Sequence, residues 1–421
     1  GNPETGDMWD AIDAVNPAEP VRRLMDSWIW QPGYPLITAS LDGDHLLLRQ
    51  QRFAFGDSDD ATVFVVPVHL GNGDRDWKVL LDHDELRVGL AHPGAPVVVN
   101  AGGHGFVRVA YDATLRSRLG GEVLSTLTTV DRYNLVDDAW NEVVAGHLDA
   151  AAVVTFVEGF GATRDLAVWQ AIATGLRGVG RLIDGAVWAA FQERVRALTA
   201  PVLAELGWEP EAGEDDLRAK LRGLLVGVVA VLGNDADAQE RCRRIVAAPT
   251  GVHPELVAAA TTAVAAVGTD ADYDLYVDRF RSAGTPQEQL RYLYALADFP
   301  TDTQLQRTLE LAMSGEVKTQ NAPFLLGRCI ANRTQGAAAW SFVRRHWAEA
   351  NERFPDNTIV RMIDPVKLLN RPEQVVDVQA FFGEHPIPQA VKTLEQVLER
   401  QRVNADLRTR DEAALATFLL G

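Results

Sequence analysis

The stretch Ala186–Leu206, AVWAAFQERVRALTAPVLAEL, determines how most of this 421-residue chain is interpreted. Its large apolar residues recur every three or four positions: Val187, Phe191, Val195, Leu198, Val202 and Leu206. That spacing places them on one face of an α-helix. Gly207 follows directly and provides a helix stop. The stretch therefore predicts an amphipathic helix with one buried side.

The same period continues through almost the whole segment from Ala113 to Gly421. Further amphipathic runs are Leu217–Leu232, Pro254–Val267, Asp272–Ser282, Pro286–Ala297, Gly336–Phe354, Pro372–Phe382 and Pro388–Arg402. A helix and its turn take roughly 15–20 residues, so a pair takes roughly the 35–45 typical of helical-hairpin repeats. No strict sequence repeat is present. The rhythm predicts an irregular all-α solenoid of the HEAT or armadillo type, with a concave face.

Before Asp112 the pattern is that of strands. Short β-rich runs are separated by Gly, Asn and Asp turns: Tyr34–Ser40, His45–Phe53, Ala61–Leu70, Trp77–Leu81, Glu85–Ala91, Pro96–Asn100 and His104–Tyr111. Seven strands without intervening helices predict a small antiparallel β-sandwich. A helix precedes them, since Asn16-Pro17-Ala18-Glu19 has the form of a helix start. The expected fold is multidomain, with β structure followed by α structure.

Charge and composition narrow the classes of partner. The chain has 40 Lys and Arg residues against 58 Asp and Glu residues, a net charge of −18. This excess disfavours nucleic acid and anionic membrane surfaces. No apolar run approaches the ~20 residues of a membrane span, and Gly1–Asp10 does not have the form of a signal peptide. Two cysteines, Cys242 and Cys329, fit buried thiols in a reducing compartment, so we expect a cytoplasmic location.

Known catalytic motifs are missing from the sequence. None of the nine histidines is followed by Glu, which excludes an H-E-x-x-H zinc helix, and there is no Cys-x-x-Cys pair, Gly-x-Ser-x-Gly elbow or Walker-type loop. Gly102-Gly103-His104-Gly105 favours a tight turn over an anion site, because it precedes a strand. We therefore assign no catalytic residue, no metal ligand and no cofactor to this chain.

Several longer motifs resemble one family, the zinc aminopeptidases of the aminopeptidase N and endoplasmic-reticulum aminopeptidase type. The matching stretches, in chain order, are Trp28–Leu36 (WIWQPGYPL), Leu47–Phe53, Val66–Val68, Val99–Asn100, Gly105–Asp112 (GFVRVAYD), Ala204–Trp208 (AELGW), Val317–Asn321 (VKTQN), Asn332, and Ala339–Phe342 with His346-Trp347. The opening Thr5–Trp9 is similar to the last helix of the family's catalytic domain. The resemblance covers nearly the whole chain in the family's order.

The resemblance implies a domain plan and a cofactor. Residues 1–17 would be the tail of a catalytic-domain-like helix, residues 18–112 a leading helix and β-sandwich, and residues 113–421 the helical domain. The family's zinc helix and G-x-M-E-N strand are not in these residues. We therefore expect zinc in the parent enzyme but none here, and a chain that is inactive alone. Departures from the family's motifs at Phe106, Ala110, His346 and Arg333 suggest a bacterial origin.

Most aromatic and basic motif residues have structural explanations. Trp28, Tyr34, Phe53 and Tyr111 are expected in the core, and Arg108 is expected to pair with a carboxylate. Trp340, Phe342 and Trp347 are expected to pack between helices.

Three residues are candidates for substrate contact. Arg328, Asn332 and Arg333 lie in an expected interruption between helices, Gly327–Gly336, of an acidic domain. A trimming exopeptidase must hold the trailing end of its peptide, and the terminal carboxylate favours basic partners. These residues are the predicted peptide-binding set, and a plain surface loop is the alternative.

The sequence thus predicts the non-catalytic C-terminal region of an aminopeptidase that shapes and gates a substrate chamber. Its partners would be peptide substrate and the missing catalytic domain of the same protein. An apolar face that normally meets that domain would favour self-association. The alternative is a free-standing helical-repeat adaptor that binds other proteins. An unrecognised hydrolase is a third possibility without a motif to support it.

Overall fold

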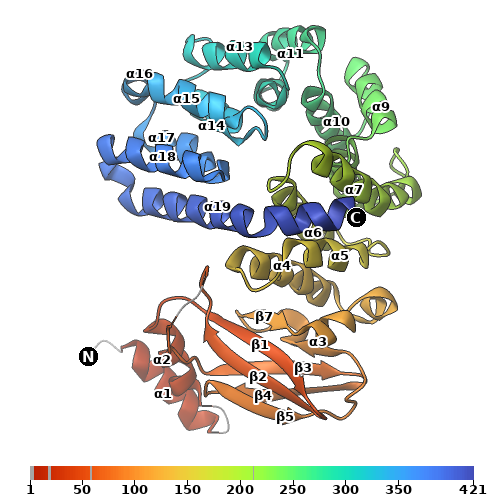
Figure 1. Cartoon of the computed structure of the whole chain (residues 1–421), viewed down its shortest axis with the longest axis vertical. Helices are drawn as coiled ribbons and strands as arrows, with labels where there is room; N and C mark the ends of the chain where they lie inside the picture. Colours follow the sequence, from red (N-terminus) through yellow and green to blue (C-terminus); the bar gives the residue numbers. More distant parts are fainter. Residues whose placement is uncertain (1–3, 18–19, 57–58, 212) are drawn as a thin grey trace. The chain divides into compact units, whose positions relative to one another are not determined.

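The computed structural model describes residues 4–17, 20–56, 59–211 and 213–421 (Figure 1). The chain forms two compact units, Gly1–Gly175 and Leu176–Gly421. The division falls inside helix α6, Leu166–Gly180. The change from strands to helices lies before this division, inside the first unit: the last strand ends at Tyr111 and helix α3 begins at Ala113. The β-then-α fold class is confirmed, and the HEAT or armadillo assignment stays a prediction.

All seven predicted strand segments form strands in the first unit. They are β1 (Pro35–Asp42), β2 (His45–Arg52), β3 (Val66–Asn72), β4 (Arg75–Leu81), β5 (Glu85–Gly89), β6 (Val97–Val99) and β7 (Arg108–Tyr111). They make a four-stranded sheet in the order β5-β2-β1-β7 and a three-stranded sheet in the order β4-β3-β6. β3 and β7 begin several residues later than expected, at Val66 and at Arg108.

The predicted antiparallel sandwich contains one parallel strand pair. β1 and β7 run parallel, with Leu36 opposite Arg108 and Ala39 opposite Tyr111. The other pairs are antiparallel. Local patterns specify strands but not their partners, so this long-range pair is not visible in the sequence.

Two polar side chains fasten the core of the first unit. The buried Gln50 amide donates to the carbonyl oxygens of Phe64 and His83, both at 2.8 Å, and its oxygen accepts from the Phe64 N–H at 2.9 Å. Tyr111 on β7 accepts a 2.8 Å hydrogen bond from the Val99 N–H of β6. Tyr111 thereby joins one strand of each sheet. Its burial confirms the predicted core position.

The helices of the first unit lie before and after the strands. They are α1 (Thr5–Val15), α2 (Val21–Ile29), α3 (Ala113–Ser117), α4 (Thr129–Ala145) and α5 (Ala150–Glu158), with 3-10 turns η1 (Ala101–Gly103) and η2 (Gly121–Thr126). The predicted helix start at 16–19 includes residues 18–19, which lie outside the described residues. The described helix begins at Val21.

The glycine-rich segment before β7 is a turn, as predicted. Gly102 and Gly103 have φ angles of +74° and +66°, which favour glycine. The Gly102 N–H donates to Asp131 of α4 at 2.7 Å. A Cβ atom on Gly103 would lie 2.4 Å from Val130. The turn therefore serves the packing of α4 beside the sheet.

Arg108 pairs with carboxylates, also as predicted. Its guanidinium lies 2.8 Å from Asp137 and 3.0 Å from Asp138 of α4. Burial raises the pKa of Asp138 to about 7 against the opposing charge of Arg108. One turn further along α4, burial raises the pKa of Glu142 to about 8, although Arg116 lies 3.1 Å away. The first unit thus contains two carboxylates whose ionisation is costly.

The described residues of the second unit form helices joined by turns and contain no strand. Its elements after α6 are α7 (Gly185–Leu206), α8 (Asp216–Gly227), a π-helical turn η3 (Val228–Leu232), α9 (Ala236–Ala247), α10 (Pro254–Ala266), α11 (Asp270–Ser282), α12 (Pro286–Ala295), η4 (Leu296–Asp298), α13 (Asp302–Met313), α14 (Ala322–Ala331), α15 (Gly336–Arg345), α16 (Trp347–Arg353), α17 (Asp356–Ile363), η5 (Asp364–Leu368), α18 (Pro372–Glu384), η6 (Pro388–Ala390) and α19 (Val391–Leu420). The helices from α7 to α18 follow an arc, and α19 returns to pack against α7 (Figure 1).

The helix expected over 186–206 forms almost as predicted. Its buried face contains Phe191, Val195 and Leu206, and it ends at Gly207 with φ +71°. The run expected over 336–354 is instead broken, because His346 separates α15 from α16. Among the helices that the structure describes, none combines the length and the apolar character of a membrane span.

The predicted packing aromatics of the late motif are buried. Trp340, Phe342 and Trp347 are 2%, 4% and 9% exposed. Trp340 contacts Phe381 edge to face at 5.2 Å between ring centres. Both cysteines are buried free thiols, as expected.

Candidate functional site

The three predicted peptide-binding residues do not share one loop. Helix α14 continues through Arg328 to Ala331, so the interruption is limited to residues 332–335 rather than 327–336. Asn332 and Arg333 lie in this short turn between α14 and α15. Arg328 lies on the exposed side of α14. The sequence overestimated the interruption because Gly327 sits inside the helix, where a Cβ atom would come within 3.1 Å of the Met362 carbonyl oxygen.

Asn332 holds the turn in place. Its amide nitrogen donates to the carbonyl oxygen of Ala297 at 2.9 Å, and its side-chain oxygen accepts from the N–H groups of Thr334 and Gln335 at 3.1 Å. These contacts occupy both ends of the amide, so Asn332 positions the turn.

Arg333 reaches from this turn to the connection between α6 and α7. It donates to the carbonyl oxygen of Gly180 at 3.0 Å and to that of Ile183, and its guanidinium lies 4.0 Å from the centre of the Trp188 ring. It also lies 3.1 Å from the Asp184 carboxylate. The α14–α15 turn is thereby fastened to the start of α7.

Asp184 collects three arginines from three elements. Besides Arg333, it accepts from Arg371 at the start of α18 at 2.6 Å and from Arg408 of α19 at 2.7 Å. Burial opposes ionisation of Asp184, but the hydrogen bond from Arg408 and the charges of the three arginines outweigh it and keep its pKa below the usual value. Three arginines thus share the Asp184 carboxylate. Arg408 also pairs with a second carboxylate, that of Glu412, at 2.8 Å.

A pocket of about 550 Å³ opens beside this turn within the second unit. Its lining comes from the ends of α6 and α14, from α7, the π-helical turn and α10, and from the residues before α13. The lining residues are Arg177, Gly180, Arg181, Trp188, Gln192, Gly227, Val231, Leu232, Asn234, Thr262, Ala266, Val267, Asp298, Pro300, Ala331, Asn332, Arg333 and Thr334. We call this the turn pocket. It includes Asn332 and Arg333 but not Arg328.

The turn pocket has an excess of positive charge in an acidic protein. Arg177, Arg181 and Arg333 line it, against the single carboxylate of Asp298. Arg181 donates to the Ala331 carbonyl oxygen at 2.6 Å, and neither it nor Arg177 forms an ion pair among the described residues. Burial, reinforced by the charge of Arg333, lowers the pKa of Arg181 to about 10. An anion bound among these arginines would stabilise their charged forms and raise the pKa of Arg181 again.

Asp298 gives the turn pocket a titratable group near neutral pH. Burial raises its pKa to about 6, while the charge of Arg328 opposes the shift. Arg328 itself lies with its guanidinium 4.8 Å from the Tyr294 ring. Arg328 therefore influences the pocket through Asp298 rather than by lining it. Below about pH 6 the pocket loses the charge of the single carboxylate among its described lining residues.

The lining of the turn pocket also contains aliphatic side chains, Val231, Leu232, Ala266 and Val267. A pocket lined by both arginines and aliphatic side chains suits a ligand with a carboxylate next to an apolar group. The described residues contain no group of three or more His, Cys, Asp or Glu side chains able to hold a metal ion.

Comparison with known proteins identifies the family. Residues 96–403 match the family model described as the ERAP1-like C-terminal domain. The match covers more than half of the chain, so the chain belongs to the family defined by this domain. The resemblance inferred from its motifs is confirmed.

Similar curated proteins are aminopeptidases. The chain is 28% identical to aminopeptidase M1 of Arabidopsis thaliana and 27% identical to aminopeptidase M1-C of Oryza sativa subsp. japonica, over 96% of its length in each case. It is 24% identical to glutamyl aminopeptidase of Rattus norvegicus. It covers 49%, 48% and 45% of these relatives, so the chain spans about half the length of the curated relatives it matches.

Sequence reasoning missed Arg177, Arg181 and Asp298. Arg181 lies 150 positions from Ala331, whose carbonyl oxygen it binds. No local pattern connects residues so far apart. The sequence gives only a general signal for them: Arg177 and Arg181 lie near the end of a predicted helical run in an acidic domain, as Arg333 does.

Proposed function

We propose that this chain is the non-catalytic C-terminal region of a zinc-dependent aminopeptidase and that it binds the peptide substrate. The family match and the aminopeptidase relatives support the class of parent protein. In this proposal the zinc and the catalytic groups belong to the catalytic domain of the same protein. The role of this chain in the whole protein is then to form part of the chamber around the substrate and to gate access to it.

The observation that carries the proposal is the charge of the turn pocket. Three arginines and one carboxylate of raised pKa line a cavity of a chain whose net charge is −18. A peptide shortened from its N-terminus keeps its C-terminal carboxylate throughout. Arginines bind carboxylates with directed, charge-assisted hydrogen bonds. We therefore assign the trailing carboxylate of the peptide to Arg177 and Arg181, and the last side chain to the aliphatic residues of the lining.

Direct binding to the 421-residue chain tests this proposal. A short peptide labelled at its N-terminus is titrated by fluorescence anisotropy, once with a free C-terminal carboxylate and once as the C-terminal amide. The free acid should bind roughly tenfold more tightly, since a hydrogen bond to a charged group is worth about 1.5–3 kcal/mol. Equal affinities for acid and amide would remove the assignment.

Variants identify the pocket in the same assay. Arg177→Gln should abolish the preference for the free acid, because Arg177 lines the pocket without an ion-pair partner in the described structure. Arg361→Gln, an exposed arginine of α17 outside the pocket, is the matched control and should leave the preference unchanged. The adaptor alternative predicts that neither variant changes peptide binding.

A further inference from the structure

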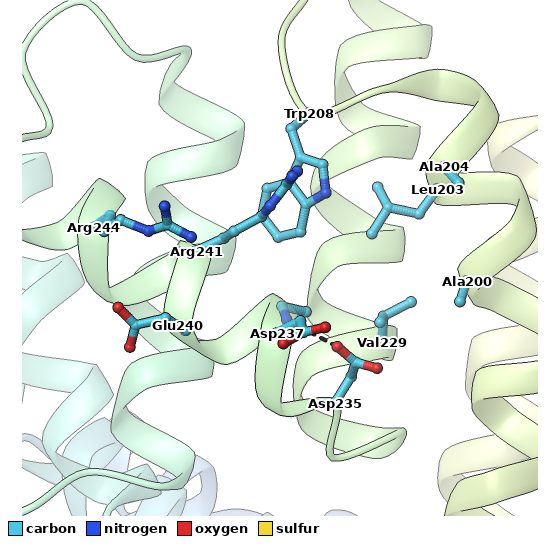
Figure 2. A pocket seen from close by; sticks show the side chains of 11 residues that line it. Ala200, Leu203, Ala204, Trp208, Val229, Asp235, Asp237, Glu240, Arg241 and Arg244 are labelled. Atoms are coloured by element: carbon cyan, nitrogen blue, oxygen red, sulfur yellow. Dashed lines mark hydrogen bonds between the residues drawn. The ribbon is translucent and has the colours of Figure 1, made fainter.

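A second pocket of the helical unit, about 530 Å³, lies between the C-terminal half of α7 and α9 (Figure 2). Its apolar wall is made of Ala200, Leu203, Ala204 and Val229, and Trp208 stands at its edge. On the α9 side the lining is charged, as Figure 2 shows. None of the turn-pocket residues takes part, so this surface is a separate feature.

Four charged side chains form one stripe along α9. Asp237, Glu240, Arg241 and Arg244 follow the spacing i, i+3, i+4 and i+7, which places them on a single helical face. All four are exposed, whereas Cys242 and Val246 on the opposite face are buried. We call these four residues the α9 stripe.

The stripe has no ionic partner within the described chain. Intrahelical pairs Asp237–Arg241 and Glu240–Arg244 have a favourable i,i+4 spacing. Yet the structure records an ion pair for neither of them among the described residues. Arg241 instead lies 5.2 Å from the centre of the Trp208 ring. Two acids and two bases are thus displayed side by side on the rim of a hollow.

The order of the charges is self-complementary about a two-fold axis. If two α9 helices pack antiparallel with the axis between positions 240 and 241, Asp237 faces Arg244 of the second copy and Glu240 faces Arg241. With a rise of about 1.5 Å per residue, both members of each pair stand at the same height along the helices. Two-fold packing repeats each contact, so four ion pairs form. A shift of the helices along each other breaks the pattern.

We propose that the α9 stripe and the adjoining pocket form an isologous homodimer interface whose partner is a second copy of this chain. The opposite-sign order specifies the antiparallel register, and the aliphatic hollow beside Trp208 receives side chains of the partner. A single helix pair buries less area than a standard interface of about 1,600 Å². The dimer is therefore weak and forms at high protein concentration. Its ion pairs are solvent-exposed, so salt weakens it, with screening over about 10 Å at 0.1 M.

Sedimentation velocity of the 421-residue chain tests the register. Asp237→Arg with Glu240→Arg makes the stripe wholly basic, and Arg241→Glu with Arg244→Glu makes it wholly acidic. Each double variant alone should lose at least about tenfold in self-association, because like charges then face each other across the axis. Mixing the two variants should restore a 1:1 dimer, since every basic position then faces an acidic one.

The control pair is Lys392→Glu with Glu395→Arg on the exposed face of α19, which should not change association. Circular dichroism and thermal unfolding show whether each variant keeps the native fold. Dimers of the wild type that weaken with salt, lost in each variant and regained on mixing, support the interface. A wild-type chain that stays monomeric at high concentration overturns it. So does a dimer insensitive to the reversals, or one that mixing fails to restore.

Discussion

Arg333 donates a hydrogen bond to Asp184 at 3.1 Å although the two residues are 149 positions apart in the chain. The same guanidinium covers the Trp188 ring and lines the turn pocket. Arg333 is therefore held by the fold on one side and faces the pocket on the other. A change in the pocket and a change in the Asp184 cluster should influence each other through this side chain.

Replacing Asp298 with Asn should remove a pH dependence of ligand binding. In the wild type, binding of a peptide carboxylate should tighten as the pH falls from 8 to 5, because Asp298, with a pKa of about 6, becomes neutral. Asp298→Asn should bind with the higher affinity across this range and show a flat profile. Fluorescence anisotropy with the free-acid peptide measures both curves. If the affinity of Asp298→Asn for the peptide still increases as the pH falls below 6, a group other than Asp298 causes the pH dependence.

Replacing Asp184 with Asn should destabilise the second unit. Three arginines lose their shared carboxylate, and Arg408 is only 6% exposed. Because Asp184 is half exposed, we expect a loss of about 1–3 kcal/mol rather than the full cost of a buried pair. Urea unfolding at pH 7 measures the loss, with the exposed Glu352→Gln as control.

The sign of the pH dependence checks this assignment. The pKa of Asp184 is lowered in the folded state, so its contribution to stability is present above the ordinary value of 3.8 and is lost as the pH falls further. The difference between wild type and Asp184→Asn should shrink below pH 4. A difference that stays constant would mean that the substitution acts through packing.

Replacing Glu142 with Gln should have the opposite pH signature. Its pKa rises to about 8 in the folded state from 4.5, so the folded chain binds more protons between these values. Its contribution to stability is complete at low pH and is lost as the pH rises through about 8. Glu142→Gln should therefore gain stability relative to wild type between pH 5 and 9. Urea unfolding across this range gives the difference, and a constant difference would contradict the shift.

Replacing Trp340 with Ala should cost about 3–5 kcal/mol, the usual range for a buried tryptophan. Its ring packs against Phe381 and Phe382, and its N–H donates to Asp377 at 3.0 Å. Ligand affinity of the fraction that remains folded should not change. A specific loss of peptide binding at unchanged stability would show that Trp340 belongs to a binding surface.

Local patterns were sufficient for the elements of the fold. The spacing from Phe191 to Leu206, followed by Gly207, predicted α7 because a helix buries every third or fourth residue. Turn residues separated the seven strands correctly. The break at His346 was missed, since the residues around it keep the helical period.

The site could be predicted only in part. Arg333 and Asn332 were identified because they interrupt a helical pattern, and both line the turn pocket. Arg328 was grouped with them by proximity in sequence, but one turn of helix separates it from the pocket wall. Arg177, Arg181 and Asp298 reach the same cavity from distant helices. Their convergence depends on tertiary packing that periodicity does not encode.

The parallel pairing of β1 with β7 has a consequence for synthesis. β1 can pair with β2 early, but its second neighbour, β7, becomes available only when Arg108–Tyr111 has left the ribosome. Until then β1 offers an open edge, which is a template for unwanted pairing with other chains. Nascent chains that stop before residue 108 should therefore aggregate more than those that extend through β7 and α4.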